Sequence, residues 1–470
     1  MIPIQYLIPE IILSLSIFSL LIIGVFIKNS FDFIYRLSIF LVFLLILVII
    51  SSDGESIKIF NESFILDEFS SFAKLLILTS SFFVLIMSKK YIQDIKNNKF
   101  EYPIIILLSI LGMFFMVSAN DLILFYLGLE LQSLSLYILA SIDRDNLKSS
   151  EAGIKYFILS ALSSGLLLYG CSLLYGFTGS TNFEVIANNT GDLNIGTIFA
   201  MIFILVGLAF KVAAVPFHMW TPDVYEGSPT SVTSFFSIVP KIAGIVVFIR
   251  FMYSPFQEII DQWQYILVFI SIASMILGAV AAIGQKNIKR LVAYSSIGHI
   301  GYAIAGIASG TANGFKSTLI YILIYAVMNI GFFAFIFLMK RKGKYIEEIS
   351  ELSGMSKNHP LASLSLLIVL FSLAGIPPLA GFFAKFYIFM AVIESGMYTL
   401  AIIGLVTTVV SAFYYIRIVK IMYFDNPKKP FESFRDFGIY GSLILSCIFL
   451  ASFFLYPSIF DGIISNINIF

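Results

Sequence analysis

The chain contains fourteen apolar runs, and each one is long enough to cross a lipid bilayer as a helix of about 20 residues. Short polar breaks separate them. Hydrophobic residues make up 59% of the 470 residues and charged residues only 12%, which is too few to cover a water-soluble surface. We therefore expect an all-α polytopic membrane protein with about fourteen transmembrane helices, at residues 6–27, 31–52, 69–88, 102–118, 121–142, 152–177, 195–217, 230–252, 263–285, 290–308, 316–339, 360–393, 397–423 and 437–457.

Lysine and arginine are distributed unequally between the connecting loops. Nineteen lie in odd-numbered loops, whereas only Lys58 and Lys316 lie in even-numbered loops or the tails. Because basic loops stay on the cytoplasmic or matrix side, we expect both termini on the periplasmic or intermembrane-space side. The net charge of +1 includes no basic tract for nucleic acid. Cys171 and Cys447 lie far apart in apolar runs, so we predict no metal site and no redox centre in this chain.

Four ionisable residues lie deep inside predicted helices. Lys241 is about eleven residues from either end of its run, about 16 Å from each surface. Glu130, Lys211 and Lys385 are also well inside theirs. A central charge costs about 3 kcal/mol on insertion, so these residues must face one another, internal water or a polar cavity. We interpret them as a proton relay; the alternative is a buried ion pair that only locks helices together.

Other ionisable residues carry weaker signals. His299, within the run SSIGHIGY, titrates near neutral pH and is a further relay candidate. His218 closes its run and is expected to be structural, and Lys74 lies close enough to a helix end to reach the surface. Arg417 and Lys420 approach the basic end of the thirteenth run, and the pattern leaves their roles open.

Two of the buried lysines lie beside predicted helix breaks. Pro216 follows Lys211 by five residues, and Pro377 and Pro378 precede Lys385. Proline removes a backbone donor and clashes with the preceding turn, and neighbouring groups or water must then satisfy the freed carbonyls. We therefore expect helices seven and twelve to be broken, which is typical of ion pathways in transporters.

The same residues indicate an internal repeat. Lys211 and Lys385 lie 174 residues apart, and Glu130 and His299 lie 169 apart, so helices 4–8 map onto helices 9–13. A five-helix unit reverses direction when it repeats, so we predict two inverted repeats, each supplying a half-channel, with Lys241 placed to link them. The expected divisions are an N-terminal three-helix segment at 1–100, repeats at 101–255 and 260–425, and a C-terminal helix at 430–470.

Four long motifs resemble those of the antiporter-like membrane subunits of respiratory complex I, the proton-pumping NADH–quinone oxidoreductase. They are FKVAAVPFHMWTPDVYEGSPTSVTSFFSIVPKIA, LGLELQSLSLYIL, RLVAYSSIGHIGYA and AGIPPLAGFFAKFYIF. The resemblance covers nearly the whole chain. It implies a functional glutamate on helix five, here Glu130, and functional lysines on helices seven, eight and twelve, here Lys211, Lys241 and Lys385.

The resemblance also implies where the redox chemistry takes place. FMN, the iron–sulfur clusters and the (ubi)quinone pocket would belong to partner subunits. Other membrane-arm subunits, including neighbouring antiporter-like ones, and lipids would surround this chain. The alternatives are a subunit of a multi-subunit cation/proton antiporter and a passive membrane scaffold. The abundance of Phe, with 49 residues, suggests an AT-rich genome. We therefore expect a mitochondrial inner membrane protein, with the bacterial cytoplasmic membrane as the alternative.

Overall fold

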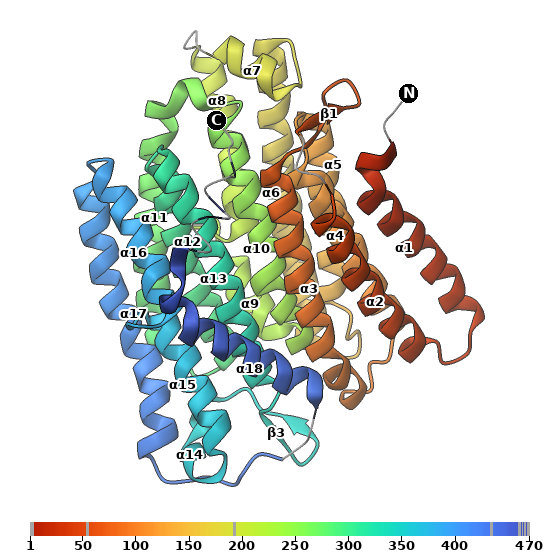
Figure 1. Cartoon of the computed structure of the whole chain (residues 1–470), viewed down its shortest axis with the longest axis vertical. Helices are drawn as coiled ribbons and strands as arrows, with labels where there is room; N and C mark the ends of the chain where they lie inside the picture. Colours follow the sequence, from red (N-terminus) through yellow and green to blue (C-terminus); the bar gives the residue numbers. More distant parts are fainter. Residues whose placement is uncertain are drawn as a thin grey trace.

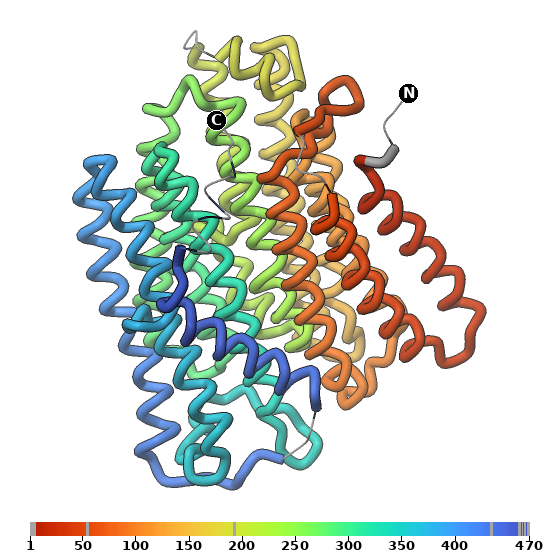
Figure 2. The backbone as a smooth tube through the Cα atoms, viewed as in Figure 1, coloured from red at the N-terminus to blue at the C-terminus, as the bar shows by residue number. Residues whose placement is uncertain are grey.

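The computed structural model describes residues 4–52, 56–190, 194–432 and 436–458, together with 462, 464 and 467. The described chain is a bundle of long helices that run roughly along one direction (Figures 1 and 2). The long helices are α1 (Ile8–Phe26), α2 (Phe31–Ile50), α3 (Glu68–Asp94), α4 (Glu101–Val117), α5 (Leu122–Ala140), α6 (Leu147–Thr178), α8 (Ile195–Val212), α10 (Thr230–Tyr253), α11 (Ile260–Ile283), α12 (Ile288–Ala308), α13 (Ala312–Ile336), α15 (Pro360–Ala374), α16 (Ala380–Glu394), α17 (Tyr398–Phe424) and α18 (Phe437–Ser452).

Short elements connect these helices. Two small antiparallel hairpins pair β1 (Ile57–Ile59) with β2 (Phe64–Leu66), and β3 (Lys340–Arg341) with β4 (Lys344–Tyr345). The short helices are α7 (Phe183–Thr190), α9 (Trp220–Gly227) and α14 (Met355–Asn358), and single 3-10 turns are η1 (Ile4–Leu7), η2 (Gln257–Ile259), η3 (Ile349–Leu352) and η4 (Phe453–Leu455).

The number of membrane crossings agrees with the prediction. Twelve helices within the described residues are long and apolar enough to span a membrane. The shorter α4 supplies one more crossing, and α15 followed by α16 supplies another. The all-α polytopic architecture with about fourteen crossings is therefore confirmed.

Ion pairs at the two ends of the bundle confirm that the loops alternate between two faces. At one end, they join odd-numbered loops to one another: Asp32 with Lys89, Asp94 with Lys340, Lys289 with Glu347, and Glu351 with Lys428. At the other end, Lys58 pairs with Glu184 across two even-numbered loops. We call these the basic end and the opposite end. Which end faces the cytoplasm stays a prediction, and both termini lie outside the described residues.

The seventh and twelfth predicted membrane helices, which correspond to α8–α9 and α15–α16, are broken, as predicted. In helix seven, α8 ends at Val212, Ala213 adopts a left-handed conformation at φ 63°, and α9 begins only at Trp220. In helix twelve, α15 ends at Ala374 and Gly375 adopts φ 85° before α16 begins. A left-handed residue just past the last turn is a common way to stop an α-helix.

Side chains satisfy the carbonyls that these breaks expose. The Trp220 indole Nε1 donates to the carbonyl of Phe210 at 3.0 Å. The Lys385 Nζ donates to the carbonyls of Leu373 and Ala374, both at 3.1 Å. The last carbonyls of a helix carry partial negative charge, so a cation is favoured there.

The core of the bundle lies around α10, α12 and α13. Every residue of α10 is buried, and all but a few of α12 and α13 are. By contrast, α1 stands at the edge of the bundle (Figure 1) and buries only a narrow stripe. Packing partners correspond between the two halves: α4 packs on α5 as α11 packs on α12, and α6 packs on α8 as α13 packs on α16. The repeat boundaries themselves remain predictions.

Candidate functional site

Lys211 lies in the last turn of α8, where the helix dipole favours a positive charge. Its Nζ donates to the hydroxyls of Ser133 on α5, at 2.6 Å, and Ser160 on α6, at 2.9 Å. Ser160 also accepts a hydrogen bond from Tyr137, at 2.6 Å. The ammonium group is thus held by neutral oxygens contributed by two neighbouring helices.

Glu130 does not form an ion pair with Lys211 in the described chain. Its Oε1 is buried and has no hydrogen-bond partner among the described residues. Glu130 nevertheless precedes Ser133 by three residues on α5 and so projects from the same face of that helix, one turn away. The carboxylate therefore lies near the lysine without contacting it.

Lys241 lies at the centre of the fully buried helix α10. Its Nζ donates to the hydroxyl of Ser296 on α12 at 2.5 Å and lies 5.6 Å from the centre of the Tyr225 ring. Ser296 in turn donates to the Ala293 carbonyl. This lysine also has no ion-pair partner among the residues described.

His299 lies one turn beyond Ser296 on α12 and is almost completely buried. Its Nδ1 is 2.7 Å from the hydroxyl of Tyr321, and its Nε2 is 3.2 Å from the hydroxyl of Tyr415. A histidine ring flanked by hydroxyls at both nitrogens can accept a proton at one and donate from the other. That is the arrangement that a relay position requires.

Lys385 is the ionisable residue of the second broken helix. Besides its two carbonyl partners on α15, its Nζ lies 5.1 Å from the centre of the Tyr302 ring. Tyr302 is one turn beyond His299 on α12, and the two rings are 6.2 Å apart. Three successive turns of α12 therefore carry Ser296, His299 and Tyr302 between Lys241 and Lys385.

The five predicted site residues thus fall into two groups. Lys241 and Lys385 contact Ser296 and Tyr302 of α12, and His299 lies on the turn between those two residues. Glu130 and Lys211 lie together at the α5–α6–α8 junction. Between these groups, no direct hydrogen bond or ion pair joins Lys211 to Lys241 within the described part of the chain.

A buried lysine–carboxylate ion pair in the N-terminal helices was not anticipated from the sequence. Lys74 on α3 and Glu10 on α1 are both buried and form an ion pair of 2.7 Å. The Lys74 Nζ also lies 5.0 Å from the centre of the Phe64 ring. The prediction that Lys74 could reach the surface is therefore wrong. The only signal for the pair was an acidic residue at the start of an otherwise apolar run.

Of the remaining candidates, Arg417 and Lys420 have partners outside the group of deep residues, whereas the buried Nδ1 of His218 has no hydrogen-bond partner among the described residues. Arg417 donates to the carbonyl of Ile283, at 2.7 Å, near the end of α11, and Lys420 pairs with Asp425 at an exposed position. His218 lies half-buried in the break between α8 and α9. Their roles in proton transfer are not supported by any contact with the buried residues described above.

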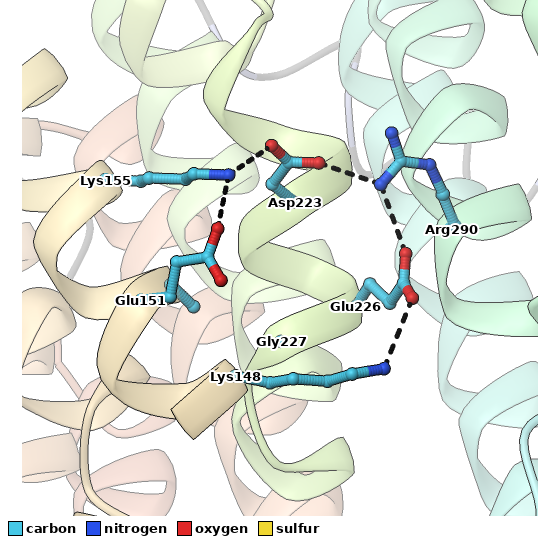
Figure 3. A pocket seen from close by; sticks show the side chains of 8 residues that line it. Lys148, Glu151, Lys155, Asp223, Glu226, Gly227 and Arg290 are labelled. Atoms are coloured by element: carbon cyan, nitrogen blue, oxygen red, sulfur yellow. Dashed lines mark hydrogen bonds and ion pairs between the residues drawn. The ribbon is translucent and has the colours of Figure 1, made fainter. Parts of the chain in front are cut away.

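Six side chains of alternating charge line a shallow pocket of about 150 Å³ at the basic end (Figure 3). The chain of ion pairs runs from α6 through α9 to α12 and includes Glu151, Lys155, Asp223, Arg290, Glu226 and Lys148 in that order. It fixes α9, the second part of broken helix seven, to its neighbours. In the described residues, no group of three or more His, Cys, Asp or Glu side chains could hold a metal ion.

Comparison with known proteins gives one consistent result. Residues 119–411 match the family model for the membrane part of NADH:quinone oxidoreductase/Mrp antiporters. The chain is 56% identical over 466 residues to NADH-quinone oxidoreductase subunit N of Pelagibacter ubique, and the match covers 99% of both chains. It is 51% identical to subunit N of Parvibaculum lavamentivorans, with 96% of this chain and 94% of that one covered.

Solved structures agree. A chain of respiratory complex I from Thermus thermophilus superposes with a TM-score of 0.85 at 28% identity, covering 97% of this chain and 99% of that one. A chain of the Mrp complex from Dietzia has a TM-score of 0.86 at 19% identity, covering 99% and 98%, and this likeness shows the fold alone.

The relatives above are the subunit N branch of the family, and they come from bacteria. The expectation of a mitochondrial inner membrane thus finds no support in them. The chain belongs to the family of antiporter-like membrane subunits of NADH–quinone oxidoreductase, respiratory complex I, in its subunit N branch.

Proposed function

We propose that this chain moves protons across the membrane through two half-channels that meet at its buried Lys, Glu and His residues. Each predicted inverted repeat, residues 101–255 and 260–425, would supply one half-channel. Lys241, on the last helix of the first repeat, would connect them through Ser296 and His299. The stroke would be driven by redox chemistry in other subunits of the complex.

The observation that carries this proposal is the kind of partner that each buried lysine has. Serine hydroxyls hold Lys211 and Lys241, and backbone carbonyls hold Lys385. Deprotonating a lysine that is held in a buried salt bridge would cost several kcal/mol, because it leaves the partner carboxylate uncompensated. Lysines held by neutral oxygens can change protonation state at much lower cost.

Glu130 would act as the control of the first half-channel. When its carboxylate approaches Lys211, the protonated lysine is stabilised; when it moves away, desolvation favours release of the proton. The arrangement described above, with Glu130 one turn from Ser133 and no direct ion pair, corresponds to the separated state. A neighbouring subunit that shifts this carboxylate would drive the switch.

The rest of the complex follows from the same proposal. We infer that FMN, iron–sulfur clusters and the quinone site lie in partner subunits, and that neighbouring antiporter-like subunits and lipids contact this chain. The bacterial relatives support the cytoplasmic membrane, with basic loops inside and both termini in the periplasm. Copurification with flavin and iron–sulfur subunits would separate this assignment from a stand-alone cation/proton antiporter.

The direct test replaces the connecting lysine. Lys241→Met, in assembled complex, should lower NADH-driven proton movement by at least about tenfold, which corresponds to a barrier change of about 1.4 kcal/mol. The neighbouring buried substitution Ile242→Met keeps the volume of the core and should have little effect. Full coupled turnover in assembled Lys241→Met complex would contradict the proposal and favour a passive scaffold.

A further inference from the structure

Two cavities lie one beyond the other between α2 and α1, the helix at the edge of the bundle (Figure 1). The inner cavity, of about 270 Å³, is lined from Ile12 to Ile23 on α1 and from Leu37 to Leu44 on α2. The outer cavity, of about 330 Å³, begins one turn nearer to the opposite end on both helices, at Pro9 and Val48. The two cavities form one slot, because their lining residues continue the same stripe of each helix at spacings of three or four residues.

The inner cavity has the length of one bilayer leaflet and the width of one hydrocarbon chain. From Ile12 to Ile23 the helix advances about 17 Å, and half of the hydrocarbon core is about 15 Å thick. A volume of about 270 Å³ drawn out over that length is much narrower than a helix, whose diameter is about 10 Å. Eight of the ten lining side chains are apolar, and Ser19, one of the two serines, donates to the Leu15 carbonyl of its own helix.

The slot is open along its outward side. Leu15 and Phe40 line the inner cavity and are 63% and 58% exposed, whereas Leu20 and Leu41 line it from below and are buried. Both α1 and α2 are long and apolar enough to cross a membrane. An acyl chain in the bilayer can therefore enter the slot sideways without crossing water.

Hydroxyl groups gather in the outer cavity, where Tyr6, Ser51, Ser52 and Ser71 line it. Ser51 and Ser52 donate to carbonyls of α2, so they can only accept further hydrogen bonds. The hydroxyls of Tyr6 and Ser71 donate to no group within the described chain, and each can donate to a bound acceptor. The slot is thus apolar in its inner part and supplies hydrogen-bond donors at its outer end.

One stripe of α3 sets the charge at that outer end. Glu68, Ser71 and Lys74 follow one another at intervals of three residues and so project from one face of α3, and the last two line the outer cavity. Lys74 is paired with Glu10 and adds no net charge. Glu68 is exposed at the outer end of the stripe and forms no ion pair in the described part of the chain. A negative charge therefore lies beside the hydroxyl donors.

We propose that the slot binds a phospholipid with a primary ammonium headgroup, phosphatidylethanolamine, from the leaflet at the opposite end. One acyl chain lies between α1 and α2, the phosphate accepts hydrogen bonds from Tyr6 and Ser71, and the ammonium group pairs with Glu68. The Glu68 carboxylate repels an anionic headgroup such as that of phosphatidylglycerol. A helix of a partner subunit is too wide to enter the inner cavity.

The bound lipid completes the packing of α1, which buries only a narrow stripe against the rest of the bundle. Its binding requires no proton transfer by this chain, so the proposal does not depend on the function proposed above. The test therefore measures occupancy of the slot and not pumping.

The experiment uses the purified intact complex and two phospholipid probes that carry the same diazirine-bearing acyl chain. One probe has a phosphoethanolamine headgroup and the other a phosphoglycerol headgroup. After illumination, labelled peptides are identified by mass spectrometry. The phosphoethanolamine probe should label α1 and α2 around the slot about fivefold more than the phosphoglycerol probe, which is the preference that one exposed charge pair can give. Unlabelled phosphatidylethanolamine should compete with it.

Two pairs of substitutions test the slot and its charge separately. Leu15→Trp obstructs the open side and should reduce labelling about tenfold. Ile22→Trp, also on α1, 56% exposed and outside the slot, should leave labelling unchanged. Glu68→Gln should abolish the preference between the two headgroups. Glu62→Gln, which changes an exposed acid in the turn between β1 and β2, should keep that preference.

Three results would overturn the proposal. Equal labelling by the two probes in the parent complex would show that the slot accepts an acyl chain of any lipid without recognising the headgroup. Crosslinks from the probe to another subunit in place of α1 and α2 would show that a partner covers this face. Labelling that Leu15→Trp leaves unchanged would place the bound lipid elsewhere.

Discussion

Two lysines inside the helix bundle have a carboxylate nearby, yet only one of them forms an ion pair with it. On the N-terminal side, Lys74 and Glu10 form a direct ion pair of 2.7 Å between α3 and α1. At the α5–α6–α8 junction, Lys211 instead donates to two serine hydroxyls, and Glu130 forms no ion pair within the described chain. We call Lys74 with Glu10, which are in direct contact, the closed pair. We call Lys211 with Glu130, which are not in contact, the open pair.

We propose that this difference separates a structural role from a switching role. A closed buried pair has already compensated both charges, so it resists a change of protonation and holds its two helices together. In the open pair, the lysine has a partner whether or not the carboxylate is close, because the two serine hydroxyls can hold it when the carboxylate is away. We therefore assign helix anchoring to Lys74 with Glu10, and proton control to Lys211 with Glu130.

The largest expected effect comes from removing one lysine at a time. Lys211→Met should lower the rate of NADH-driven proton movement by at least about tenfold, because the proton-carrying group is lost. Lys74→Met should leave that rate within about twofold once values are normalised to assembled complex. Equal losses in the two variants would remove the distinction drawn above.

Stability should respond in the opposite order. Lys74→Met leaves Glu10 as an uncompensated buried charge and should cost about 3–5 kcal/mol in the N-terminal helices. The double variant with Glu10→Gln should recover most of that loss. The measurement is the thermal midpoint of the purified complex, read from exposure of a cysteine placed on α1. A single variant as stable as the parent would mean that the pair anchors nothing.

A smaller effect should come from the serine hydroxyls that hold Lys211 when Glu130 is not in contact with it. Ser133→Ala removes one of the two oxygens at Lys211 and should change the pumping rate about fivefold, since a typical hydrogen bond contributes about 1 kcal/mol. Ser135→Ala is the matched control, because that hydroxyl donates to the Leu131 carbonyl of its own helix. Identical rates in both variants would count against the role of Ser133.

The smallest effect concerns Glu351 and its two ion-pair partners, Arg341 and Lys428, in the loops at the basic end. Hydrogen bonds from Lys428 and Arg341 hold the pKa of Glu351 below its ordinary value of 4.5. Because folding lowers the pKa of Glu351, the stabilisation that its ion pairs give is complete at pH values above the ordinary pKa. It is lost as the pH falls through the lowered pKa. The Glu351 side chain is 23% exposed, so solvent screens its ion pairs and we expect them to contribute less than about 1 kcal/mol.

Amide hydrogen exchange of residues 340–359, corrected for intrinsic rates, should therefore be constant from pH 8 to about 5.5. Protection should decrease only below the ordinary glutamate range, and Glu351→Gln should abolish that step. A transition near neutral pH would show that another group controls this loop.

Much of the fold could be predicted from the sequence because a bilayer imposes length and polarity on every helix. The runs, the breaks beside Pro216 and Pro377, and the deep positions of Lys241 and Lys385 all follow from local pattern. Contacts between distant helices do not. Glu10 is far from Lys74 along the chain, and only the packing of α1 near α3 brings them together. The open geometry at Lys211 likewise depends on hydroxyls from two other helices.

The central claim is that Glu130 and Lys211 work as one switch, and a double-mutant cycle tests it most directly. Proton pumping per NADH oxidised is measured in membranes for Glu130→Gln, Lys211→Met and the double variant, each normalised to assembled complex. We predict that both single variants are impaired and that their effects are strongly non-additive, with a coupling of at least about 1 kcal/mol. Two single effects that simply add would show that the residues act independently, and the switch would then be wrong.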